Sequence, residues 1–147
     1  MAANPPSKNI ADILSSSGIG VWASDVATDW AIVVGDLRDD PNTQICIMDS
    51  PGRSPEPGLD INYPSVQIIV RTSANDYLNG WYKCRDIRDV LLGRPSEERD
   101  GDVWASCVMA GDIMSLGKDE NGRPLLAMNF DLIIHQGDLT NSHRTAC

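Results

Sequence analysis

Apolar residues at helical spacing predict a first helix near the start of the chain. In the segment PPSKNIADILSSSG, Ile10, Ile13 and Leu14 recur on one side. Ser7 follows a Pro pair and is the expected N-cap, because its hydroxyl can accept from a free amide of the first turn. Gly18 is expected to end this helix.

A second and better-defined helix is predicted between Ser73 and Gly93. Ser73, with Asp76 three residues later, resembles a capping box, and Gly93 supplies a C-terminal stop. The apolar stripe between them, which we expect to dock onto a sheet, consists of Tyr77, Trp81, Cys84, Ile87 and Leu91.

Runs rich in β-branched residues predict the strands. They are AIVV, a strand from about Thr43 to Asp49, the continuous run SVQIIVRT, a strand from about Val103 to Met109, and PLLAMNFDLIIHQ. Asn121-Gly122 favours the tight turn of a hairpin before the last strand. The long segment SPGRSPEPGLDINYP is expected to be a loop, and the tail GDLTNSHRTAC to be frayed. One α+β domain over residues 1–147 follows, with a largely antiparallel β-sheet and two helices packed on one face.

Charge narrows the range of partners. Twelve Lys and Arg stand against 21 Asp and Glu, which gives a net charge of -9 and a pI near 4.4. Such a chain is repelled by nucleic acid and anionic membranes, so neither is an expected partner. No long apolar segment follows the start, which favours a cytoplasmic product without a membrane span.

The cysteines do not predict a metal site. Cys46, Cys84, Cys107 and Cys147 are far apart and form no CxxC pair, so zinc is not expected. The first three lie in apolar stretches and are expected to be buried and reduced, whereas Cys147 is expected to be exposed.

Catalytic patterns are sparse. The two histidines, His135 and His143, have no neighbouring ligand pattern, and no nucleophile elbow or phosphate-binding loop occurs. The carboxylates of GDLRDDP (Asp36, Asp39, Asp40) and of the hairpin (Asp119, Glu120) are expected to be solvated turn residues. We therefore expect no enzyme, no catalytic residue, no metal and no cofactor. A small hydrolase or metal enzyme using the carboxylates between Asp36 and Asp49 stays an alternative.

Three segments in order resemble the tail terminator proteins of long-tailed bacteriophages. They are NYPSVQIIVRTSANDYLNGWYKCRDIRDVLLG, the strand with Val103 and Trp104, and LGKDENGRPLLAMNFDLII. The positions that carry the resemblance are Pro64, Arg71, Tyr77, Ile87, Leu91, Asp119, Gly122, Arg123, Asn129 and Phe130. The resemblance implies a homo-oligomeric ring, usually hexameric, that caps the tail tube, stops its polymerisation and meets head completion proteins on its other face. It implies a virion protein assembled in the host cytoplasm, and a head closure protein is the alternative within the same class.

Assembly of this kind needs contact residues. The candidate interface residues are Trp22, Trp30, Arg53, Arg71, Arg85, Arg88 and Arg123. The arginines could pair with carboxylates of a neighbouring subunit or of their own, and the Pro-rich loop could be a docking arm or a plain connection. Trp81 and Trp104 are expected in the core.

Overall fold

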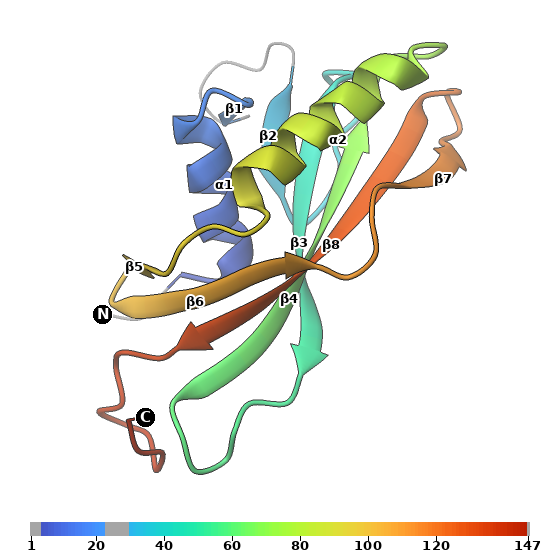
Figure 1. Ribbon diagram of the computed structural model, residues 1–147. Coiled ribbons are helices and arrows are strands. Elements are labelled where there is room, and N and C mark those ends of the chain that lie inside the picture. The colour runs from blue at the N-terminus through green and yellow to red at the C-terminus, as the bar shows by residue number, and fades with distance from the viewer. Residues whose placement is uncertain (1–3, 23–29, 147) are drawn as a thin grey trace.

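A computed structural model describes residues 4–22 and 30–146 of the chain. In these two ranges the chain forms two helices and one eight-stranded sheet (Figure 1). The helices are α1 (Pro6–Ser16) and α2 (Tyr77–Leu91). The strands are β1 (Val21–Trp22), β2 (Ala31–Val34), β3 (Gln44–Arg53), β4 (Ile61–Arg71), β5 (Glu97–Arg99), β6 (Asp102–Met109), β7 (Met114–Lys118) and β8 (Pro124–His135).

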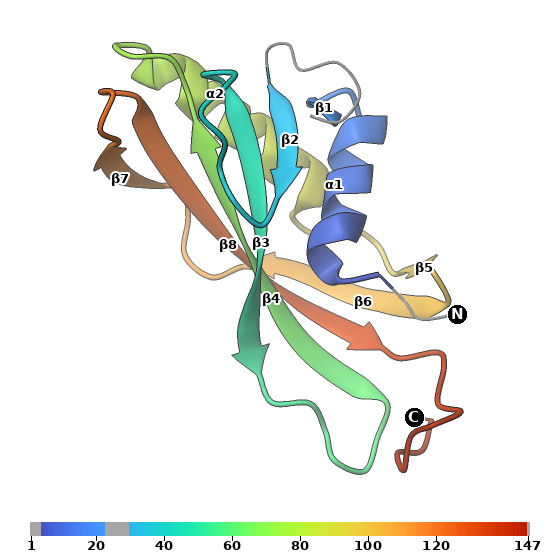
Figure 2. The same cartoon turned by 180° about the vertical axis from the view of Figure 1, so that it is seen from behind.

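The sheet is curled and mixed. Its strand order is β1-β2-β3-β4-β8-β6-β5, and β7 also pairs with β8 (Figures 1 and 2). The pairs β1–β2 and β2–β3 are parallel, and the other described pairs are antiparallel. The α+β class is confirmed, but the sheet is not simply the antiparallel one predicted. Nine residues, 35–43, join β2 to its parallel neighbour β3. So short a connection usually joins antiparallel strands in a hairpin, whereas parallel strands usually need a crossover of a dozen or more residues.

Buried and less buried residues alternate along much of the two central strands, and the buried ones form the core. Val66, Ile68 and Val70 of β4 are fully buried, and Met128 and Phe130 of β8 join them in one cluster with the buried side of both helices. α1 contacts β2 and β3, whereas α2 contacts β8 and β4. That both helices cover one face of the curled sheet stays a prediction. Trp104 is buried in this cluster, as expected.

The N-terminus of α1 is capped from a distant strand. Pro5 is the N-cap residue, so the prediction of Ser7 was wrong. The backbone N–H and the hydroxyl of Ser7 instead donate to the two carboxylate oxygens of Asp49 in β3, at 3.0 and 2.7 Å. A carboxylate at this position also interacts favourably with the positive end of the helix dipole.

α2 begins later than its sequence signal. Asp76 is the N-cap residue and makes no side-chain cap, so the capping box at Ser73 is not formed. Cys84, Ile87 and Leu91 are buried as predicted, but Tyr77 is exposed and Trp81 is only partly buried against the core. The helix lies very close to the sheet at Gly80, where an added Cβ would stand 2.9 Å from Leu126 Cδ1.

The Pro-rich loop is shorter than predicted, because β3 and β4 continue into it. They pair as far as Arg53 and Tyr63, which leaves residues 54–60 as the connection. Pro64 is tolerated inside β4 because it lies where the register with β3 shifts, between Ser50 and Arg53 of that strand. Toward β8 the register is unchanged, and the pairs on either side of Pro64 are those of Asn62 and Ser65.

The C-terminal segment is bonded to the rest of the domain, contrary to the prediction that it is frayed. The backbone N–H of Thr145 donates to the carbonyl of Gly58 at 3.1 Å, and Arg144 donates to Asn62 Oδ1 at 2.8 Å. Residues 144–145 thus pack on the connection between β3 and β4. Cys46, Cys84 and Cys107 are buried and free, as expected, whereas Cys147 lies outside the described residues.

Candidate functional site

The loop of residues 35–43 runs back across the sheet. It leaves the end of β2 and returns to the start of β3, its parallel neighbour (Figure 2). Gln44, the first residue of β3, is fully buried beneath it. Its amide nitrogen donates to the carbonyls of Arg38 and Pro41, both at 2.8 Å, and its amide oxygen accepts from the Arg38 N–H.

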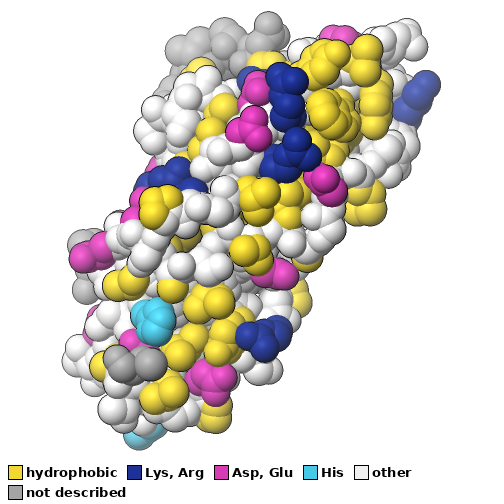
Figure 3. Space-filling model, viewed as in Figure 1, with side chains coloured by type: hydrophobic (Ala, Val, Ile, Leu, Met, Phe, Trp, Pro, Cys, Tyr) yellow, Lys and Arg dark blue, Asp and Glu magenta, His cyan; other side chains and the backbone are white. Residues whose placement is uncertain are grey.

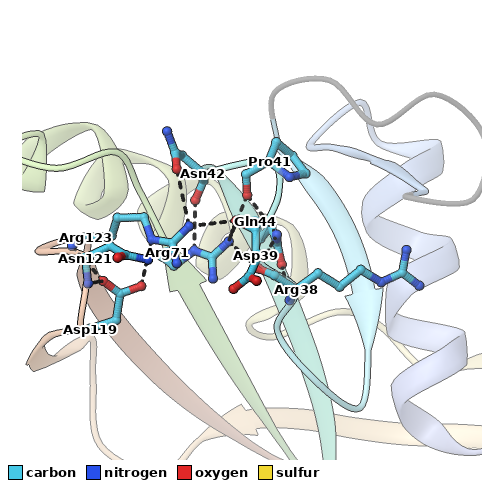
Figure 4. Close-up of polar contacts among 9 residues, drawn as sticks. All are labelled: Arg38, Asp39, Pro41, Asn42, Gln44, Arg71, Asp119, Asn121 and Arg123. Atoms are coloured by element: carbon cyan, nitrogen blue, oxygen red, sulfur yellow. Dashed lines mark hydrogen bonds and ion pairs between the residues drawn. The ribbon is translucent and has the colours of Figure 1, made fainter.

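Arg71 is the principal anchor of this loop. It ends β4, its side chain is buried, and its guanidinium donates to four main-chain carbonyls of the loop (Figure 4). Nε donates to the carbonyl of Asn42 at 3.1 Å, and Nη2 donates to those of Arg38, Asp39 and Pro41. Burial lowers the pKa of Arg71 and the adjacent charge of Arg123 lowers it further, opposed by nearby carboxylates.

Arg123 anchors the same loop from the hairpin before β8. Its Nη1 donates to the carbonyl of Asp39 at 2.7 Å and to Asn42 Oδ1 at 3.3 Å, while its Nε donates to Asp119 Oδ2 at 2.7 Å. Asp119 also accepts the backbone N–H groups of Asn121 and Arg123. Desolvation raises the pKa of Asp119, but these hydrogen bonds outweigh it, so the pKa lies below its ordinary value. The turn predicted here is confirmed, with Gly122 at φ 75°.

The result is an acidic surface whose main chain is held by two buried arginines. The two guanidinium groups are engaged in hydrogen bonds within the subunit, while the side chains of Asp36, Asp39 and Asp40 are exposed. In residues 4–22 and 30–146 these three carboxylates form no salt bridge. The same ranges contain no cluster of three His, Cys, Asp or Glu that could hold a metal ion. A surface of this kind suits protein recognition.

A second surface lies on the outward side of α2, on the opposite face of the sheet. Gly80 of α2 approaches Leu126, which pairs across the sheet with Val70. Adjacent strand residues point to opposite faces, so Arg71 and the loop that it holds lie on the other side. Figures 1 and 2 show the same arrangement, with α2 and the 35–43 loop separated by β3 and β4.

The outward side of α2 carries exposed apolar and aromatic residues next to arginines (Figure 3). Leu78 is 61% exposed and Tyr82 47% exposed. Trp81 packs edge-on against Tyr82 with ring centroids 6.0 Å apart, and the guanidinium of Arg85 lies 5.3 Å from the Tyr82 ring. We call Leu78, Trp81, Tyr82, Arg85 and Arg88 the α2 outer surface; their spacing places them on one side of the helix.

The predicted interface residues are thus spread over several places. Arg71 and Arg123 meet at the loop, with intramolecular contacts, and Arg85 and Arg88 share the α2 outer surface, where Arg88 also bonds to Asp112 at 2.9 Å. Trp22 and Trp30 pack against the core, beneath Lys8 and Lys83 respectively. Arg53 is exposed and stacks 4.0 Å from the centre of the Tyr63 ring.

Arg53 and Tyr63 line a hollow of about 430 Å³ at the other end of the sheet, together with Ser65, Val108, Asp131 and Ile133. The hydroxyl of Ser65 donates to Asp131 there. No histidine or cysteine lines this hollow, and a serine bound to a carboxylate alone lacks the base that activates such a nucleophile. The hollow therefore holds neither a Ser–His nor a Cys–His pair.

Sequence reasoning missed Gln44, Leu78 and Tyr82. Gln44 could have been noticed as an amide that opens an otherwise apolar strand. Leu78 and Tyr82 are large apolar residues outside the predicted stripe, and such residues on a solvated helix side indicate a contact surface. The loop carbonyls carry no sequence signal at all.

The comparison with protein families decides the class of protein. A family model described as bacteriophage tail terminator protein matches residues 13–136. The chain belongs to the bacteriophage tail terminator family. A comparison with curated proteins found no match. The matched range of this tail terminator family member includes residues 13–16 at the end of α1, all of α2, the 35–43 loop and both anchoring arginines.

Family membership makes this chain a structural component of a phage tail, in a family whose role is structural rather than catalytic. None of the helices in the described ranges is both long and apolar enough for a membrane span.

Proposed function

We propose that this chain forms a hexameric ring that caps the tail tube, ends its polymerisation and joins the finished tail to the head. The observation that carries the proposal is the family match over residues 13–136. One side of the ring would bind the tail tube protein and the other a head completion protein. The protein would be assembled in the host cytoplasm, remain in the virion and catalyse no reaction.

Physical features of the subunit support this role. A closed cyclic ring uses two different patches on each subunit, and the described structure has two exposed patches of different character on opposite faces of the sheet. The charge of -9 makes subunits repel one another at long range, so a ring needs specific contacts that overcome the repulsion.

A phage from which this protein is deleted tests the proposal. We expect tails of abnormal length that do not join heads, in lysates where heads still form and package DNA, all measured by electron microscopy. Supplying the wild-type protein from a plasmid should restore joined tails of uniform length. Joined tails of normal length in the deletion would contradict the proposal, and normal tails beside heads that lose their DNA would indicate a head closure protein instead.

A further inference from the structure

The α2 outer surface has the composition of a protein contact site. Trp, Tyr and Arg are the residues that most often dominate binding energy. Here the Tyr82 ring meets Trp81 edge-on and lies beneath the guanidinium of Arg85, and Leu78 of the same helix is exposed. Arg85 has only a weak pairing with Asp86, at 3.7 Å between half-exposed groups. Its charge is therefore available to a partner.

The 35–43 loop is complementary to that surface in charge and also offers apolar area. Asp36, Asp39 and Asp40 supply exposed carboxylates, and Val34, where the loop begins, is 41% exposed. The buried guanidinium groups of Arg71 and Arg123 fix the main chain of the loop. A fixed surface loses little conformational entropy on binding, which favours affinity.

The two surfaces cannot meet within one subunit, because they lie on opposite faces of the sheet. We infer that the α2 outer surface of one copy binds the 35–43 loop of the next copy. This inference rests on the proposed ring and names the contact that closes it. Because the two surfaces differ, the contact is heterologous, and an open row of copies keeps one free surface of each kind, at its two ends, until the ring closes.

Two variants, each damaged on one surface, test this arrangement. The double variant Leu78→Glu, Tyr82→Glu should destroy the α2 outer surface, and Asp36→Lys, Asp39→Lys should destroy the loop surface. We expect each to be monomeric at concentrations where the wild type is a ring, measured by light scattering after size exclusion. Mixed in equal amounts they should form a dimer and nothing larger, since the first variant keeps its loop and the second its helix surface.

Matched controls keep the result interpretable. Glu98→Lys changes an exposed charge on β5, away from both surfaces, and should leave the ring intact. Circular dichroism and thermal melting show whether each double variant is folded. A double variant that does not fold is replaced by the corresponding single substitutions.

Three outcomes would overturn the inferred contact. They are rings from either double variant, no dimer from the mixture of folded variants, or a wild type that stays monomeric at all concentrations. The tail-length phenotype of the deletion decides the proposed function independently, so a wrong contact and a wrong function give different results.

Discussion

Arg71 and Arg123 donate to the same acceptor, the carbonyl oxygen of Asp39, at 3.2 and 2.7 Å. Two buried cations on one carbonyl repel each other, and the repulsion contributes to the lowered pKa of Arg71. The arrangement persists because each guanidinium has further acceptors: three more carbonyls for Arg71, and Asp119 and Asn42 for Arg123. The loop and the two arginines therefore form one cooperative unit.

Removing the first of these arginines should destabilise the protein. Arg71→Met keeps much of the side-chain volume but leaves loop carbonyls without donors, and we expect a loss of about 2 to 3 kcal/mol in the free energy of unfolding. Urea denaturation measures it. The matched control is Arg38→Ala, because only the main chain of Arg38 is held and its side chain is exposed. That control should change stability by less than about 0.5 kcal/mol; equal losses would contradict the anchoring role of Arg71.

The hydrogen bonds of Asp119 make a pH-dependent contribution. Its pKa is lowered from 3.8 in the folded protein, so its carboxylate stabilises the fold above pH 3.8. This contribution is lost as the pH falls through the lower folded pKa. The stability difference between wild type and Asp119→Asn should therefore be largest near neutral pH and shrink below pH 3.8, measured by urea denaturation at several pH values. A pH-independent difference would contradict it, and Asp131→Asn offers a comparison away from the loop.

Three cysteines should be unreactive in the native protein. Burial raises the pKa of Cys84 to about 12. Burial, and to a smaller extent the charge of Asp36, raises the pKa of Cys46 to about 11. Burial also raises the pKa of Cys107 to about 11. The thiolate is the reactive form, so a thiol reagent at pH 8 should label Cys46, Cys84 and Cys107 only after denaturation. Mass spectrometry of the labelled peptides checks each site, and rapid native labelling of any of the three would show that its region opens.

The close approach of α2 to the sheet predicts that Gly80→Ala is destabilising. Alanine favours the helix by about 1 kcal/mol, but its methyl group would meet the buried Leu126 and Thr72 at about 3 Å, and such overpacking costs about 1 to 3 kcal/mol. We expect a net loss of about 1 kcal/mol in thermal or urea denaturation. Asp89→Ala, at an exposed position of the same helix, should be nearly neutral; a stabilised Gly80→Ala would mean that the helix can move outward.

The two helices, the central strands and the hairpin turn were predictable because their signals are local. The continuous β-branched run in SVQIIVRT and the helical stripe ending at Leu91 need no knowledge of distant residues. The cap of α1 was not predictable, because its acceptor is Asp49, 42 residues away, and Ser7 carries the same local signal whether or not it caps the helix. The loop anchors were hidden for a related reason. Arg71 reads as a strand-end cation, and the main-chain carbonyls that it binds are common to every sequence.

The path of the 35–43 loop also bears on how the chain could change in length. Val34, the last residue of β2, pairs with Ile47, whereas β3 begins at Gln44. The loop must therefore cover the length of three strand residues, which is roughly 10 Å. Nine residues can span roughly 30 Å, so about two thirds of the loop is spare length. That surplus forms the arch that brings Asp39 within reach of Arg123. Deletions of two or three residues would still allow β2 and β3 to pair, but would pull the arch off both guanidinium groups, so natural length variation in this loop should be paired with substitutions at Arg71 and Arg123.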